Sequence, residues 1–223
     1  MTVRAVLFDL DGTLADTAPD LAGALNRLLE EQGREPVPLE RARPATSSGA
    51  RGMLRVGLGI DPEHAEYASL KARFLDLYAG DVCRETRLFD GVSELLAALE
   101  RLAIAWGVVT NKPERFTVPL LEALELLERA ACVVGGDTAE RAKPHPDPLL
   151  QAARALGLPP ADCLYVGDDR RDVQAARAAG MPVLAAGYGY LGEDGDPLAW
   201  GADAVIGHPL DVLNHLGRAA RVG

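Results

Sequence analysis

The chain has 223 residues, a formal net charge of −10 and 48% hydrophobic residues, which is the composition of a folded globular protein with one large domain or one domain with an insert. Its acidity, without any run of Lys and Arg, predicts no nucleic-acid partner, and no apolar stretch approaches the roughly 20 residues of a membrane span. With no signal-peptide pattern and no Cys-x-x-Cys pair among its 3 cysteines, we expect a cytoplasmic protein with reduced thiols.

The first expected element is a strand over Ala5–Phe8, which leads directly into Asp9, Asp11 and Gly12. A strand that is apolar at every position is typical of a parallel sheet, and open sheets of this class bind ligands at the carboxyl ends of their strands. Alternation along an extended chain points both carboxylates to one side. Their repulsion indicates a bound divalent cation or one protonated carboxyl. The alternative is a strand that ends in an ordinary Asp-Gly turn.

Residues 17–81 have a different pattern, because apolar side chains recur there at helical spacing and no convincing strand occurs. The periodic positions are Leu21, Leu25, Leu28, Leu29, Leu70, Phe74, Leu75 and Tyr78. We therefore predict an all-helical insert over residues 17–81, with residues 1–16 and 82–223 forming the main domain.

Apolar runs and helical segments alternate over the rest of the chain, which predicts βαβ units and a doubly wound, Rossmann-like α/β fold with a mostly parallel sheet. Glycines stand where several of the helices are expected to start or stop. The expected strands are residues 105–109, 131–134, 163–166, 182–185 and 204–206, and the expected helices are residues 93–102, 119–126, 147–156 and 172–179.

Polar residues follow two of these strands, and a lysine stands at a proline turn between them. Each residue has an ordinary interpretation as a turn or helix cap or a solvated side chain. Because a doubly wound sheet brings the carboxyl ends of its strands together, we expect these residues to share one crevice with Asp9 and Asp11. They are Thr110, Asn111, Lys143, Asp168, Asp169 and Asp172.

The charges of these side chains suggest roles in phosphoryl transfer. Asp9 is a candidate nucleophile toward phosphorus. Asp9 and Asp168 offer oxygen ligands to Mg²⁺. Lys143 and Thr110 are expected to bind the transferred phosphoryl group, and Asp11 is expected to protonate the leaving oxygen and then deprotonate water.

Together these motifs resemble the haloacid dehalogenase superfamily of phosphatases, over nearly the whole chain. The resemblance rests on four ordered motifs: Asp9-Leu10-Asp11-Gly12-Thr13, Thr110-Asn111, Lys143-Pro144 and Gly167-Asp168-Asp169-Arg170-Arg171-Asp172. It implies an aspartyl-phosphate on Asp9 and Mg²⁺ bound by Asp9, Asp168 and the main-chain carbonyl of Asp11. It leaves open whether Asp169 or Asp172 touches the metal, and we expect Asp172 to orient Lys143 or a metal-bound water.

The resemblance also implies that the helical insert is a cap, which closes over the site and selects the substrate. Within it, Ser48, Gly49 and Arg51 stand at an expected helix start, where backbone amides and a guanidinium suit an anion. The alternative is an ordinary helix cap with an exposed arginine. In the main domain, Asn111 is expected to contact the substrate together with Thr110.

Two relatives within the superfamily share further stretches with this chain. Residues 109–113 and 143–150 resemble phosphoglycolate phosphatases, whereas residues 48–51, 200–203 and 208–210 resemble phosphatases of N-acetylmuramic acid 6-phosphate. Both substrates carry a carboxylate beside the phosphate, so we expect a Mg²⁺-dependent phosphatase of a small carboxylated phosphate ester, as a monomer or homodimer. The alternatives are a phosphomutase, a sugar-phosphate phosphatase or, outside enzymes, a receiver-like phosphoacceptor domain.

Residues 187–192 match the Gly-x-Gly-x-x-Gly pattern of dinucleotide-binding loops, but no helix is expected after them. We therefore expect a loop near the rim of the site rather than a nucleotide site. The histidines show no metal-ligand spacing and are expected at the surface or at helix caps.

Overall fold

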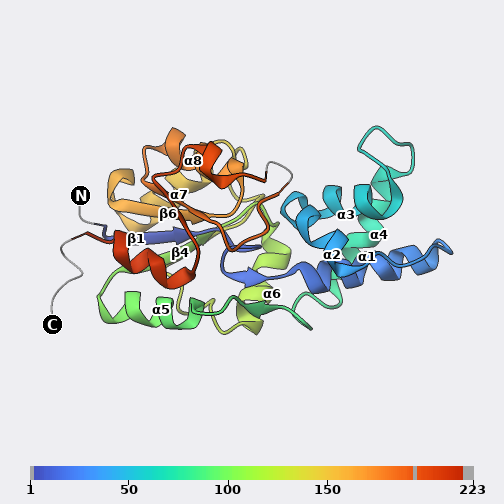
Figure 1. The fold of residues 1–223 in the computed structure, drawn as a ribbon, viewed down its shortest axis with the longest axis horizontal. Coiled ribbons are helices and arrows are strands. Elements are labelled where there is room, and N and C mark those ends of the chain that lie inside the picture. The colour runs from blue at the N-terminus through green and yellow to red at the C-terminus, as the bar shows by residue number, and fades with distance from the viewer. Residues whose placement is uncertain (1–2, 193–194, 218–223) are drawn as a thin grey trace.

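The computed structural model describes residues 3–192 and 195–217, so residues 1–2, 193–194 and 218–223 of the predicted main domain lie outside the described residues. Its core is a six-stranded sheet in the order β5-β4-β1-β6-β7-β8 (Figure 1). All neighbouring strands are parallel, which confirms the predicted α/β fold. The strands are β1 (Ala5–Phe8), β4 (Ala105–Val109), β5 (Cys132–Val134), β6 (Cys163–Gly167), β7 (Val183–Ala186) and β8 (Ala204–Ile206).

Helices cover both faces of this sheet. The helices α5 (Val92–Arg101) and α6 (Glu114–Ala123) contribute to one hydrophobic cluster, and α7 (Asp147–Leu156) and α8 (Arg170–Ala179) contribute to the other. Helices on opposite faces are the property that defines a doubly wound sheet.

The position of β1 at the centre of the sheet explains why its four residues are all apolar. Val6 and Phe8 belong to the first cluster, and Ala5 and Leu7 belong to the second. Each of the four is at most 1% exposed. Because successive side chains of a strand point to opposite faces, a central strand buried on both sides requires an apolar residue at each position.

A helical part follows the first strand, as predicted, and lies at the right of Figure 1. It has a hydrophobic cluster of its own, and all buried members of that cluster lie within residues 21–78 except Phe116 of α6. The elements are α1 (Ala18–Glu31), α2 (Leu39–Ala42), the 3₁₀ segment η1 (Arg43–Ser48), α3 (Gly49–Leu58) and α4 (Tyr67–Ala79).

The two connections between the core and the helical part run side by side. They contain the short strands β2 (Ala15–Asp16) and β3 (Arg87–Leu88), which pair antiparallel. Near them, the buried carboxylate of Asp20 accepts main-chain N–H bonds from Arg84 and Thr86 at 3.0 and 2.9 Å. Strands of two residues leave no periodic signal, which is why the sequence does not reveal them.

The prediction of a helix start at residue 119 is wrong, because α6 begins at Glu114 and Pro119 lies inside it. A proline favours the first position of a helix, which made residue 119 look like a start. Pro119 has no N–H group to donate. Only the carbonyl of Arg115, four residues earlier, therefore lacks its helical hydrogen bond. Burial of Phe116, Leu120 and Leu121 on one side keeps the chain helical through the proline.

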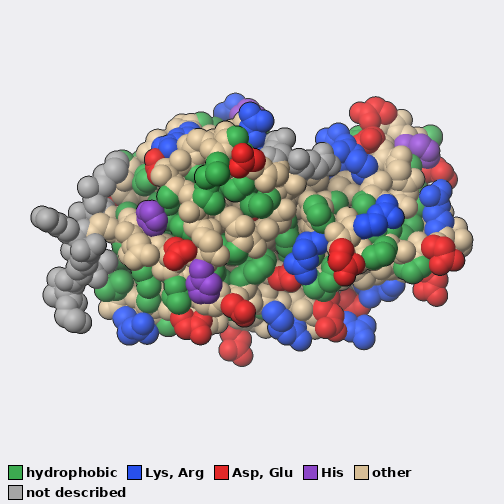
Figure 2. Space-filling view, viewed as in Figure 1, with side chains coloured by type: hydrophobic (Ala, Val, Ile, Leu, Met, Phe, Trp, Pro, Cys, Tyr) green, Lys and Arg blue, Asp and Glu red, His purple; other side chains and the backbone are tan. Residues whose placement is uncertain are grey.

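Charged side chains of both signs lie on the face of the molecule that is drawn in Figure 2. On the face shown in Figure 2, Lys and Arg are interspersed with Asp and Glu. No helix of the described residues combines the length and the apolar character that a membrane span requires. All three cysteines are free thiols.

Candidate active site

The carboxyl ends of the central strands open into a cavity of about 570 Å³, whose other wall comes from α3 and α4 of the helical part. The cavity therefore lies between the two parts of the molecule, where open α/β sheets bind ligands. Every site residue predicted from the sequence lines it: Asp9, Asp11, Ser48, Gly49, Arg51, Thr110, Asn111, Lys143, Asp168, Asp169 and Asp172.

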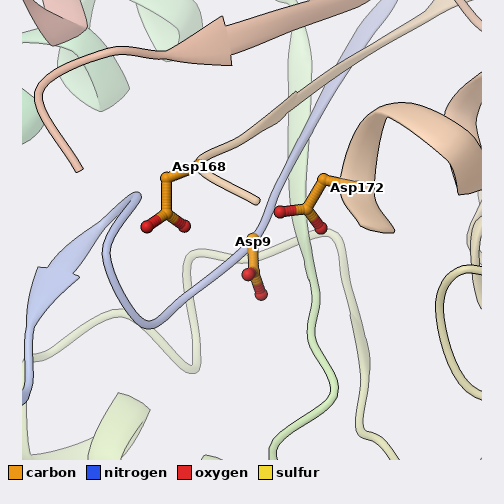
Figure 3. A group of neighbouring side chains, drawn as sticks. All are labelled: Asp9, Asp168 and Asp172. Carbon is orange, nitrogen blue, oxygen red and sulfur yellow. The ribbon is translucent and has the colours of Figure 1, made fainter. Parts of the chain in front are cut away.

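Three carboxylates converge at the floor of this cavity (Figure 3). One oxygen from each of Asp9, Asp168 and Asp172 lies within 4.8 Å of the others. Asp9 directly follows β1, Asp168 directly follows β6, and Asp172 belongs to α8. The main-chain N–H of Tyr190 and the hydroxyl of Thr13 fix Asp168 by donating hydrogen bonds of 2.8 and 3.1 Å to its two oxygens.

Burial and repulsion between neighbouring carboxylates both raise the pKa values of the Asp9 and Asp168 carboxyls. Burial raises the pKa of Asp9 to about 6, although the Lys143 ammonium opposes the change. Burial, with Asp9 and Asp172 nearby, raises the pKa of Asp168 well above its ordinary value. The Oδ1 atom of Asp9 is buried and accepts no well-oriented hydrogen bond from the described residues. Because Mg²⁺ prefers carboxylate oxygens and would offset this repulsion, the residues present fit that ion.

Lys143 supplies the cation beside these carboxylates. Its Nζ lies 3.0 Å from Asp9 Oδ1 and 2.6 Å from Asp172 Oδ1, and it donates to the Tyr165 hydroxyl and the Val109 carbonyl at 2.8 and 3.0 Å. Although burial opposes the charge, Asp172 and Asp9 raise the pKa of Lys143. The side chain, only 2% exposed, is thus a charged group held in one position.

Of the two polar residues directly after β4, Asn111 binds the main chain of Lys143. Asn111 Nδ2 donates to the Lys143 carbonyl, and the Lys143 N–H donates to Asn111 Oδ1, both at 2.9 Å. The buried Thr110 hydroxyl accepts the N–H of Lys112 at 3.2 Å. These contacts tie the Asn111 amide to the main chain of Lys143, whereas its expected role is substrate binding.

Asp11 lies in the same cavity but outside the group of three carboxylates. The Thr17 hydroxyl donates to its Oδ1 at 2.6 Å, and Lys112 Nζ lies 3.0 Å from that oxygen. The Asp11 carboxylate is thus bound by Thr17 and Lys112, and the resemblance implies that Asp11 contacts the metal through its main-chain carbonyl. Lys112 is a buried cation that the sequence interpretation missed. Its place just after Thr110 and Asn111 was the available signal.

Asp169 and Asp172 also form the cap of α8. Asp169 accepts the Arg171 N–H at 2.8 Å, and Asp172 accepts the Asp169 N–H at 3.1 Å. The helix-cap interpretation therefore holds for Asp172, which also accepts a hydrogen bond from Lys143 Nζ. The Arg171 guanidinium binds the Asp169 carboxylate at 2.8 Å and the Ser47 carbonyl at 2.6 Å. This pair joins α8 to the helical part.

Arg51 lines the cavity from α3, whose first residue is Gly49. Its side chain is 56% exposed, and its Nε lies 3.7 Å from Asp61 Oδ1. Arg55 already donates to that same oxygen at 2.8 Å. The contact of Arg51 with Asp61 is therefore long and shared.

The loop of residues 187–192 lies beside the site, and it contains a second residue that sequence reasoning missed. The Tyr190 hydroxyl accepts the N–H groups of Thr17 and Ala18 at 2.7 and 2.9 Å and donates to Asp16 at 2.8 Å. Its main-chain N–H holds Asp168. Tyr190 thus connects a carboxylate of the floor with the start of α1.

Comparisons with known proteins agree with this geometry. A family model described as haloacid dehalogenase-like hydrolase matches residues 6–186. An N-acetylmuramic acid 6-phosphate phosphatase of Pseudomonas putida is 43% identical over 95% of this chain and 95% of its own. A phosphoglycolate phosphatase of Xanthomonas campestris is 46% identical over 92% of this chain and 93% of its own. The crystal structure of a protein described as a predicted phosphoglycolate phosphatase from Haemophilus somnus has a TM-score of 0.85 at 28% identity, covering 96% of this chain and 98% of that one.

These matches confirm the resemblance that the four motifs indicate, and they extend it from the motifs to the whole fold. The chain belongs to the haloacid dehalogenase-like hydrolase family.

Proposed function

We propose that the protein is a Mg²⁺-dependent phosphatase that hydrolyses small carboxylated phosphate monoesters through a phosphorylated Asp9. Family membership and the phosphatase names of its relatives support the reaction class. The observation that carries the proposal is the position of Lys143 Nζ, 3.0 Å from Asp9 and 2.6 Å from Asp172, at the floor of an open cavity. A fixed cation beside a carboxylate is what phosphoryl transfer requires.

Asp9 is the nucleophile in this mechanism. One carboxylate oxygen attacks the phosphorus of the ester, the bond from phosphorus to the substrate oxygen breaks, and the phosphoryl group moves to Asp9. Lys143 offsets charge on the equatorial oxygens, and the Thr110 hydroxyl donates a hydrogen bond to the same group. Asn111 acts on the phosphoryl group indirectly, because its amide holds the main chain of Lys143.

Asp11 is the acid and base. It donates a proton to the departing oxygen while the bond from Asp9 to phosphorus forms. It then accepts a proton from the water that attacks the phosphorylated Asp9, which releases phosphate and restores the free carboxylate. Thr17 and Lys112 hold its side chain at the cavity.

Asp9, Asp168 and the main-chain carbonyl of Asp11 would hold Mg²⁺, with Asp172 and Asp169 behind them. The ion supplies charge neutralisation for the phosphoryl oxygens when it is bound. Tyr190 and Thr13 orient Asp168 for this role.

The helical part serves as the cap domain in this proposal, with residues 17–81 forming the cap and residues 1–16 and 82–223 the core domain. It covers the cavity and excludes water until Asp9 is phosphorylated. Ser48, Gly49 and Arg51 face the substrate from α3 and the turn before it. We place the enzyme in the cytoplasm as a monomer or homodimer without a nucleic-acid partner.

A phosphate-release assay tests the proposal. Purified protein is incubated with 2-phosphoglycolate, N-acetylmuramic acid 6-phosphate and an aryl phosphate, with Mg²⁺ or with EDTA. Phosphate release that requires Mg²⁺ and disappears in Asp9→Asn is the expected result. Substantial turnover by Asp9→Asn would contradict the role of Asp9. Transfer of phosphate within the substrate, without release, would indicate a phosphomutase.

A further inference from the structure

The cations at the floor of the cavity are already matched by carboxylates. Lys143 is paired with Asp9 and Asp172. Lys112 is paired with Asp11 at 3.0 Å. The third floor cation, Arg171, is paired with Asp169. A substrate carboxylate that bound at the floor would therefore compete with ion pairs that the protein already makes.

The remaining cations of the cavity wall are exposed, lie on α3, α4 and α6, and have no close carboxylate partner among the described residues. Lys71 of α4 is exposed and forms no ion pair with the described residues, and Arg115 of α6 is exposed and stacks on the Phe116 ring instead. Arg51 has only its long, shared contact with Asp61. The cations without a close carboxylate partner thus lie on the outer wall, whereas the floor holds more carboxylates than cations.

Between the floor and these cations the wall is apolar. One face of α4 lines the cavity with Tyr67, Lys71, Phe74 and Tyr78, residues that follow one another at helical spacing. Leu21, Leu75 and Phe116 continue this surface. The Tyr78 hydroxyl is buried and has no well-oriented hydrogen-bond partner in the described part of the chain. Lys112 Nζ lies 4.6 Å from the centre of the Tyr78 ring. A ligand that reaches along α4 from the floor would therefore meet apolar surface and then the Lys71 cation.

We infer that the cavity binds a bulky phosphate ester whose carboxylate is held by Lys71, with Arg51 assisting from α3. This inference rests on the proposed function and narrows its substrate. 2-Phosphoglycolate has only two carbon atoms, so its carboxylate stays close to the phosphoryl group, beside cations that are already paired. A cavity of about 570 Å³ lies within the range of sites for much larger ligands. N-acetylmuramic acid 6-phosphate has a sugar ring between its phosphate and its lactyl carboxylate, and an acetyl group beside the lactyl ether. A ligand of this length can place its phosphate at the floor and its carboxylate at Lys71, with the ring against the apolar residues of α4.

The test compares two sugars that differ in the lactyl group alone, N-acetylmuramic acid 6-phosphate and N-acetylglucosamine 6-phosphate. Loss of a charge-assisted contact of about 1.5–3 kcal/mol corresponds to a factor of about 10 to 100. Lys71→Met is therefore expected to lower kcat/KM for the muramic ester by about 10-fold or more, mainly through KM. The ester without the carboxylate is expected to change by less than about twofold, since it makes no contact with the ammonium.

Arg73→Met is the matched control. Arg73 is exposed on the same helix, but it pairs with Glu31 and does not line the cavity. It is expected to leave the ratio of the two kcat/KM values unchanged. The midpoint of thermal unfolding is measured for both variants. A midpoint close to that of the wild type shows that the variant keeps its fold.

Four outcomes would overturn the inference. Two concern Lys71→Met, namely equal losses on both sugars or no loss on either. Two concern the wild type, namely no distinction between the two sugars or a preference for 2-phosphoglycolate over the muramic ester. Phosphate release from an aryl phosphate separates this failure from failure of the proposed function. If the wild type hydrolyses the aryl ester but does not distinguish the two sugars, only the inference about Lys71 is wrong. If it hydrolyses none of the esters, the phosphatase proposal itself is wrong.

Discussion

Asn111 and Lys143 exchange two hydrogen bonds of 2.9 Å, one from the Asn111 amide to the Lys143 carbonyl and one from the Lys143 N–H to the Asn111 amide oxygen. This exchange joins the segment after β4 to the loop that carries the lysine. The Nζ of that lysine lies between Asp9 and Asp172. The position of the cation at the candidate nucleophile therefore depends on an amide that does not itself contact either carboxylate.

Asn111→Ala removes both bonds, so we expect Lys143 to lose its fixed position. A misplacement of about 1 Å is sufficient to reduce kcat about 100-fold, and stability is expected to fall by about 1–3 kcal/mol because buried main-chain groups lose their partners. Steady-state kinetics and urea unfolding measure the two effects. Asn111→Asp keeps the acceptor and is expected to lose less activity. Unchanged kcat in a destabilised Asn111→Ala would show that the amide serves stability alone.

Asp168→Asn is expected to stabilise the metal-free protein at neutral pH. Burial raises the pKa of Asp9 to about 6 and that of Asp168 above its ordinary value. A folded-state pKa above the unfolded one means that the folded protein binds more protons, so stability present at low pH is lost as pH rises through the folded pKa. The wild type in EDTA should therefore lose stability from about pH 4 to beyond pH 6. Thermal unfolding across this range should show a weaker decline in Asp168→Asn.

Mg²⁺ is expected to reverse this loss in the wild type, because a ligand that binds only the folded state raises the unfolding free energy. Asp168→Asn lacks one of the three clustered carboxylates and should gain much less. Thermal unfolding with Mg²⁺ and with EDTA measures the gain for each protein. An equal gain in both would remove Asp168 from the metal-binding residues.

Asp11→Asn is expected to separate the two chemical steps. With an aryl phosphate the leaving group needs little protonation, so Asp9 can still be phosphorylated, but no base remains to activate water. A burst of phenol followed by slow turnover, with the phosphorylated chain visible by mass spectrometry of the intact protein, is expected. Asp9→Asn is the control that should show neither. Normal steady-state turnover by the Asp11→Asn variant would show that Asp11 is not the base.

Tyr190→Phe is expected to loosen the start of α1 without removing the bond to Asp168, because that bond comes from the main-chain N–H. The N–H groups of Thr17 and Ala18 lose their acceptor, which should speed hydrogen exchange of residues 16–18 and lower kcat, while the Mg²⁺ dependence stays as in the wild type. Tyr188→Phe is the comparison, since the Tyr188 hydroxyl donates to the Thr13 carbonyl instead. The same exchange in both variants would argue against this role of Tyr190.

The core strands and the polar residues at their ends could be predicted from sequence because the signals are local. A strand buried on both faces must be apolar throughout, as β1 is, and parallel topology brings the carboxyl ends of the strands to one edge. The elements that the sequence analysis misplaced or missed also have local causes. The start of α6 was misplaced because Pro119 looks like a first residue, and two-residue strands such as β2 show no periodicity.

What the sequence determined by itself was therefore the sheet, the helical insert and the polar residues at the strand ends that line the cavity. The tertiary structure alone decided which partners those residues take: Asn111 binds Lys143, Asp11 binds Lys112, and Asp168 binds Tyr190. It also decided which cations, Lys71 among them, remain unpaired within the described residues and face the cavity. The physical reason is that periodicity records which side of an element is buried, whereas the partner of a polar side chain depends on distances between segments that only packing sets.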